Sequence, residues 1–127
     1  MCVEATARNQ GIPKAYWGPR CTGEEAGLSA FVEIREGDAL ETLRESDGPI
    51  DLLLNDGFPM LALDIVKLLA PRMRPGAVVI TDNVRTFPGN YADYMAYMRS
   101  PESGFCTTLL PYKSGTGFSV RCAGEGA

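Results

Sequence analysis

Two carboxylates and one amide stand at points of the chain where buried strands are expected to end. Asp56 follows the apolar run 50–54, and Asp82 and Asn83 follow a second apolar run, 77–81. In an open parallel sheet, ligands bind outside the carboxyl ends of the strands, and neighbouring strands lie about 4.8 Å apart. Three oxygen ligands suit a hard cation such as Mg²⁺. The alternative is that both aspartates only cap the loops that follow.

A weaker candidate for ligand binding is the turn formed by Gly37, Asp38 and Ala39, which also follows an expected strand. Glycine permits close approach to the backbone, and the start of a helix offers free N–H groups. Capping of that helix by Asp38 explains the pattern equally well.

The elements that must position these residues alternate between strand and helix. Continuous apolar runs are typical of strands buried on both faces of a parallel sheet, and the segment between them has a helical apolar stripe. Strands are expected at 31–35, 50–54, 77–81, 105–110 and 117–122, and helices at about 39–44, 59–70 and 90–99, with a loop at 72–76. Tyr91, Tyr94, Met95 and Met98 form a stripe that predicts a core or subunit contact.

This order predicts an α/β fold whose sheet is mostly parallel and ends in a C-terminal antiparallel hairpin. We expect an irregular N-terminal segment over 1–23, one domain over 24–122, and a tail over 123–127.

Composition excludes several functional classes. The net charge of −4 argues against nucleic acid and anionic membranes as partners. The absence of histidine excludes nucleophilic catalysis by a Ser-His-Asp triad or a Cys-His pair. No apolar run is long enough to span a bilayer and the N-terminus has no signal-peptide pattern, so we expect a cytoplasmic protein. Its four cysteines contain no CxxC pair and are expected to be reduced and mostly buried.

Four segments resemble the cation-dependent O-methyltransferases, the group that includes the catechol and caffeoyl-CoA enzymes. They are GLSAFVEIREGDALETL, IDLLLNDG, LLAPRMRPGAVVITDNV and SGFCTTLLPYKSGTGFSV, in the same order as in the family. The resemblance covers about residues 24–122 and implies part of a Rossmann-like methyltransferase sheet.

The resemblance implies a divalent cation, such as Mg²⁺, held by Asp56, Asp82 and Asn83. It also implies that S-adenosylmethionine is bound by Gly37, Asp38, Ala39, Asp56 and Phe58. The cation would hold two vicinal oxygens of a catechol-like acceptor and lower the pKa of the hydroxyl group that is methylated.

The chain also departs from the family pattern. Pro59 stands where a general-base lysine is usual, and Ala62 stands about where a tyrosine is usual, so no catalytic base is identified. The family's first two strands, with their glycine-rich turn, find no counterpart in 1–23, which implies an N-terminally truncated chain with unpaired strand edges. The alternative function is therefore a non-catalytic remnant that acts as a binding or oligomerisation module, for example as a homodimer.

Overall fold

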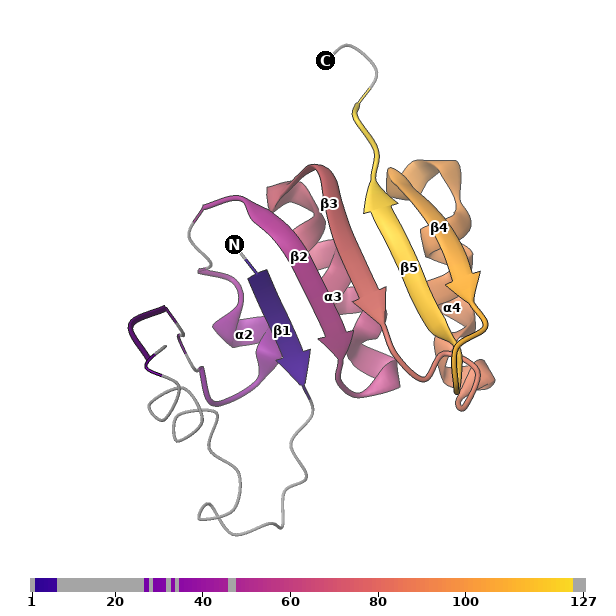
Figure 1. The fold of residues 1–127 in the computed structure, drawn as a ribbon, viewed down its shortest axis with the longest axis horizontal. Helices are drawn as coiled ribbons and strands as arrows, with labels where there is room; N and C mark the ends of the chain where they lie inside the picture. The colour runs from indigo at the N-terminus through magenta and orange to yellow at the C-terminus, as the bar shows by residue number, and fades with distance from the viewer. Residues whose placement is uncertain are drawn as a thin grey trace, which may run out of the picture.

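A computed structural model describes residues 2–6, 27, 29–31, 33, 35–45 and 48–124. Its centre is a five-stranded sheet with the strand order β1-β2-β3-β5-β4 (Figure 1). The strands are β1 (Cys2–Thr6), β2 (Ile50–Asp56), β3 (Met73–Thr81), β4 (Phe105–Leu110) and β5 (Thr116–Arg121). β1, β2 and β3 run parallel, and β5 is antiparallel to both β3 and β4. The predicted α/β class, with a mostly parallel sheet and a C-terminal hairpin, is confirmed.

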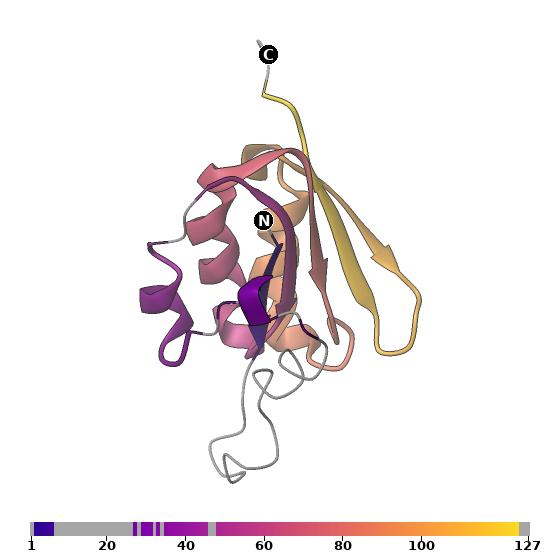
Figure 2. The ribbon, with the colours of Figure 1, turned by 60° about the vertical axis from the view of Figure 1, so that its left-hand side comes forward.

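The principal helices lie on one side of this sheet. α3 (Ala62–Leu69) and α4 (Pro88–Arg99) lie behind it in Figure 1 and to its left in Figure 2. α2 (Ala39–Thr42) packs against α3. Single turns of 3₁₀ helix complete the described elements: η1 (Ser29–Phe31), η2 (Pro59–Leu61), η3 (Ala70–Arg72) and η4 (Pro101–Ser103). The three expected helices are confirmed, and proline begins both η2 and α4, as its fixed φ favours.

The hydrophobic core fills the space between the sheet and α3 and α4. Leu53 of β2 and Val79 of β3 are completely buried and face these helices. The predicted stripe of α4 is buried along its whole length (Tyr91, Tyr94, Met95, Met98). Its role as core is therefore confirmed.

The opposite face of the sheet carries apolar side chains that are only partly buried. The residues paired across β2, β3 and β5 on this face are Leu52, Leu54, Val78, Ile80, Phe118 and Val120. No α-helix of the described residues covers this face, which is turned toward the viewer in Figure 1. We call these six residues the open face.

Three local predictions were wrong. Cys2–Thr6, expected to be irregular, forms β1 and pairs in parallel with Leu52–Asp56, so one edge of β2 that we expected to be open is occupied. Of the expected strand 31–35, the structure describes residues 31, 33 and 35 and none of them lies in a strand; Phe31 ends η1 with 84% of its surface exposed. The expected loop 72–76 instead opens β3, which begins at Met73 and pairs with Ile50 before the register shifts.

The remaining N-terminal predictions fall largely outside the described residues. Gly27, predicted to close a helix, has a φ of +70°, but the helix itself and the turn-rich run 16–23 are not described.

Among the described residues, no helix is long and apolar enough to cross a membrane. Cys106 and Cys122 are free thiols, as expected, but Cys106 is exposed and Cys122 half-buried, so the expectation of burial was wrong for both.

Candidate functional site

The carboxyl ends of β2 and β3 lie side by side. Asn55 and Thr81 are the last residues that pair between these strands. Asp56 and Asp82 directly follow this pair, so they reach the same edge of the sheet on neighbouring strands. Both are partly exposed and thus accessible to a ligand. The prediction that β2 and β3 are neighbouring strands is confirmed.

Each strand end is fixed by a buried polar side chain. The Asn55 amide Nδ2 donates to the Ala62 carbonyl oxygen at 3.1 Å, which ties the loop after β2 to the start of α3. The Thr81 hydroxyl shares a 2.6 Å hydrogen bond with the hydroxyl of Tyr94, which ties the end of β3 to α4. Burial raises the pKa of Tyr94 to about 12, so its hydroxyl stays protonated at neutral pH. Both aspartates therefore extend from anchored backbone.

Asn83 is held by the β4–β5 hairpin. It has a φ of 59°, in the left-handed region, where asparagine is tolerated better than most residues. The Ser114 hydroxyl donates to its Oδ1 at 2.5 Å, and the Arg85 N–H donates to the Ser114 carbonyl at 2.9 Å. Gly115 has a φ of +84°, which favours glycine, and a Cβ there would lie 2.6 Å from Cγ of Arg85, so a larger residue would also displace the Arg85 side chain. These contacts fix the amide oxygen of Asn83 beside Asp82.

The negative charges of Asp56 and Asp82 both influence the phenol of Tyr91. Burial raises the pKa of its phenol, and the negative charges of Asp56 and then Asp82 raise it further. The fields of both carboxylates therefore reach the same hydroxyl. The sequence identified Tyr91 only as part of an apolar stripe, and the only available signal was the polar end of that side chain on a buried face. Ser114 gave no signal at all.

These side chains fit a divalent cation by their chemistry. Among the described residues, no group of three or more His, Cys, Asp or Glu side chains could hold a metal. A cation at the β2–β3 edge would therefore need the amide oxygen of Asn83 as its third protein ligand. That oxygen already accepts one hydrogen bond from Ser114 but has a second lone pair. Two carboxylates and an amide form a set of hard oxygen ligands that Mg²⁺ accepts.

The residues expected at the cofactor are distributed differently. The Asp38 carboxylate caps α2 by accepting from the Leu40 N–H at 2.9 Å, and Gly37 has a φ of +133°. The capping role is thus confirmed, whereas nothing in the structure tests cofactor binding by Gly37, Asp38 or Ala39. At the other end of α2, the Leu43 carbonyl accepts from Arg72 at 2.9 Å.

The loop after β2 supplies the remaining predicted residues. Phe58 is half-exposed and follows Asp56 by two residues. Pro59 occupies the first position of η2, and it has no group that could accept a proton. Ala62 is buried at the start of α3, where its carbonyl receives the Asn55 amide. The structure therefore supplies no base from these positions.

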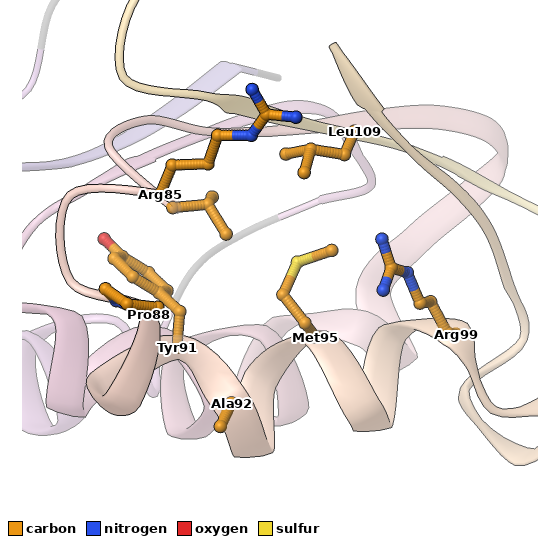
Figure 3. Close-up of a pocket in the computed structure, with 8 residues that line it drawn as sticks. Arg85, Pro88, Tyr91, Ala92, Met95, Arg99 and Leu109 are labelled. Atoms are coloured by element: carbon orange, nitrogen blue, oxygen red, sulfur yellow. The ribbon is translucent and has the colours of Figure 1, made fainter. Parts of the chain in front are cut away.

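A pocket of about 240 Å³ lies below the loop that follows Asn83. In Figure 3, Met95 rises from α4 toward Leu109 of β4, Tyr91 leans toward the end of the pocket where Arg85 lies, and Arg99 lies at the opposite end. Its volume is below the roughly 300 Å³ at which small-molecule pockets begin. It can therefore take only a small apolar group, on the α4 side of the aspartate pair.

No family model matches the sequence, and a comparison with curated proteins gives no match. Solved structures do match. Cofactor-bound Rv0187 from MTB superimposes with a TM-score of 0.77 at 22% identity, covering 96% of this chain and 61% of its own. The O-methyltransferase from Bacillus cereus in complex with SAH gives 0.67 at 25% identity, covering 80% and 56%. The O-methyltransferase TomG from Streptomyces achromogenes, in complex with SAM, gives 0.66 at 22%, covering 81% and 55%.

The chain has the fold of the class I O-methyltransferases. This agrees with the resemblance found in the sequence, and the β2–β3 edge is the carboxyl edge of that O-methyltransferase sheet. The chain spans between 55% and 65% of the length of the first three solved structures that it matches.

Proposed function

We propose that the chain acts in S-adenosylmethionine-dependent O-methyl transfer, assisted by a divalent cation, to a small catechol-like acceptor. The observation that supports this proposal is the position of Asp56, Asp82 and Asn83 at the ends of two neighbouring parallel strands within an O-methyltransferase fold. Binding of S-adenosylmethionine is supported by the complexes of two structurally similar O-methyltransferases with SAH and SAM.

In this proposal Asp56 and Asp82 hold the cation through their carboxylates, and Asn83 through its amide oxygen. When bound, the cation supplies Lewis acidity that lowers the pKa of an acceptor hydroxyl. The chain's own contribution is positional: Ser114 orients the Asn83 amide, and Thr81 holds the end of β3 against Tyr94. Such supporting contacts typically change metal affinity by about 10–100-fold when they are lost.

The half-exposed ring of Phe58 and the turn of Gly37, Asp38 and Ala39 are the surfaces we propose for the cofactor. Methyl transfer from sulfonium to oxygen requires the two atoms to be held in line, so placement contributes much of the rate. Because Pro59 cannot take a proton, the proton that leaves the acceptor hydroxyl would pass to solvent rather than to this side chain. Asp56 and Asp82 would hold the cation whose positive charge favours that loss.

Calorimetric titration with Mg²⁺, with and without S-adenosylmethionine, tests the proposal directly. Asp82→Asn should weaken Mg²⁺ binding by about tenfold or more, since a ligand matters at least as much as its supporting contacts. Asp64→Asn is the matched control, because Asp64 lies exposed on α3, and it should leave the affinity unchanged. Transfer of a labelled methyl group to catechol gives the activity readout.

Two results would reject the proposal for this chain. One is a folded protein that shows no heat of binding with Mg²⁺ or S-adenosylmethionine. The other is equal Mg²⁺ affinity for Asp82→Asn and Asp64→Asn, which would place the cation elsewhere.

A second candidate function, a binding module that self-associates, is favoured by the open face. Its six partly exposed apolar side chains form a continuous surface across three strands, and surfaces of this kind are typical of protein interfaces. A second copy of the chain is the partner we propose, since closed symmetric dimers are the commonest assemblies.

Sedimentation velocity over a range of concentrations distinguishes this candidate. Ile80→Glu, on the open face, should shift the protein from dimer to monomer, whereas Ala96→Glu on the exposed side of α4 should not. A wild-type chain that remains monomeric at every concentration would exclude self-association.

A further inference from the structure

Two cysteine thiols meet on neighbouring strands of the C-terminal hairpin. The Sγ atoms of Cys106, in β4, and Cys122, directly after β5, lie 2.8 Å apart. A disulfide bond is about 2.05 Å long, so the sulfurs need to approach by only about 0.8 Å to bond. Both residues are free thiols.

The antiparallel register accounts for this meeting. Cys106 lies directly opposite Val120, so the side chains of these two residues project from the same face of the sheet. Cys122 follows Val120 by two residues, and residues two apart along a strand share a face. The side chains of Cys106 and Cys122 therefore project from the same face. The Cys122 N–H donates to the Gly104 carbonyl at 2.9 Å, which extends the ladder beyond the end of β5. Backbone hydrogen bonds therefore hold both residues in place, and the contact does not depend on flexible loops.

Access to the pair is uneven. Cys106 is exposed, whereas Cys122 is half-buried. The hydrogen bond with Cys106 and then burial raise the pKa of Cys122, while the adjacent Arg121 opposes this shift. Cys106 is therefore the thiol that an external reagent reaches first, and Cys122 is placed to react with it afterwards.

We propose that Cys106 and Cys122 form a redox-active dithiol that a small-molecule disulfide, such as oxidised glutathione, converts to a cross-strand disulfide. The Cys106 thiolate attacks one sulfur of the oxidant, forms a mixed disulfide and releases one glutathione thiolate. Cys122 gives its proton to solvent, attacks the Cys106 sulfur and releases the second glutathione. The two cysteines lose two protons and two electrons, and the oxidant is reduced to two thiols.

Cross-linking would join β4 to the end of β5 next to the open face. Val120, a member of that face, lies directly opposite Cys106. The oxidised form should therefore have a hairpin that opens less readily than that of the reduced form, because the bond closes the segment between the two strands.

The full chain with Cys2→Ser and Cys21→Ser isolates the pair. After equilibration with reduced and oxidised glutathione and quenching with an alkylating agent, intact mass should show the loss of two hydrogen atoms and no retained glutathione. Trypsin separates the two thiols into residues 100–113 and 122–127, so a disulfide-linked pair of these peptides identifies the bond. The ratio of disulfide to dithiol should be about tenfold or more higher in native protein than in urea, because the fold raises the effective concentration of one thiol near the other.

Single substitutions resolve the order of events. Cys122→Ser should accumulate a glutathione adduct on Cys106, and Cys106→Ser should react more slowly at Cys122. If the serine background fails to fold, peptide mapping of the wild-type chain gives the same linked peptides. Native protein that carries two glutathione adducts and no linked peptide would overturn the proposal, and so would equal cross-linking in urea.

Discussion

Removal of the hydrogen bond between Thr81 and Tyr94 should destabilise the protein in a way that a double-mutant cycle can isolate. The two hydroxyl groups lie 2.6 Å apart, and Thr81 and Tyr94 are 0% and 2% exposed. Among the described residues, no buried side-chain nitrogen or oxygen lacks a partner. Thr81→Val keeps the shape but leaves the Tyr94 hydroxyl buried without a partner, which costs about 1–3 kcal/mol.

Tyr94→Phe is expected to cost about 1 kcal/mol, because the ring still fills its place and only the Thr81 hydroxyl loses its partner. The double variant removes both polar groups, so its free energy of unfolding should exceed the value expected from adding the two single effects. The coupling energy should lie between about 0.5 and 3 kcal/mol. For a chain of this size, each kcal/mol corresponds to a fall in Tm of roughly 3–6 °C.

Urea denaturation followed by far-UV circular dichroism measures all four proteins. An unchanged m value shows that the midpoint shifts report stability and not a change in compactness. Tyr97→Phe is the matched control, because its ring lies on the same helix and is partly exposed, with the Lys67 Nζ 5.0 Å from its centroid. It should change stability by less than about 0.5 kcal/mol. Additive single effects would refute the claim that this pair anchors the end of β3.

Three further predictions concern the same region. The pKa of Tyr94 is raised to about 12 in the folded state, so its contribution to stability is fully present below its unfolded value of about 10 and is lost as the pH rises toward 12. As the pH rises from below 10 to about 12, the free energy of unfolding of Tyr94→Phe should fall by roughly 3 kcal/mol less than that of the wild-type protein. Urea denaturation at the two ends of this pH range measures the difference. Asp82→Asn should lower the pKa of Tyr91, because one of the two negative charges that oppose its ionisation disappears. Ultraviolet titration, with Tyr91→Phe as the reference, detects the shift. An unchanged pKa would contradict the convergence of the two carboxylates on Tyr91. Ser114→Ala should weaken Mg²⁺ binding by about 10–100-fold in calorimetry by releasing the Asn83 amide, and unaltered affinity would show that Ser114 has no orienting role.

The parts of the fold that the sequence predicted are those with strong local patterns. The apolar run 50–54, the striped helix after Pro59 and the run 77–81 each specify their own element, and parallel neighbours place Asp56 and Asp82 at one edge without further information. β1 was missed because five residues with little apolar alternation become a strand only through pairing with β2, fifty positions later in the chain. Residues 31, 33 and 35 show the converse, since they belong to an alternating pattern but the structure places none of these three described residues in a strand.

The supporting residues of the site were missed for a related reason. Ser114 is 31 positions from Asn83, and only the folding of the β4–β5 hairpin against the loop after β3 brings their side chains together. Tyr91 fits the apolar stripe of its helix, so the sequence pattern accounts for it as a core residue and does not indicate a separate role for its hydroxyl group. Sequence patterns therefore located the atoms proposed as ligands, but not the contacts that orient them.

The distribution of these contacts separates the two halves of the proposed site. The edge that carries Asp56, Asp82 and Asn83 is fixed by three side-chain hydrogen bonds, which come from α3, α4 and the hairpin. In contrast, the Asp38 carboxylate caps its own helix, and α2 is held at its other end by Arg72. Cation affinity should therefore depend on the hairpin and α4, whereas cofactor affinity should depend on α2 and on the loop that carries Phe58. A variant that alters one affinity and spares the other is the expected outcome of this architecture.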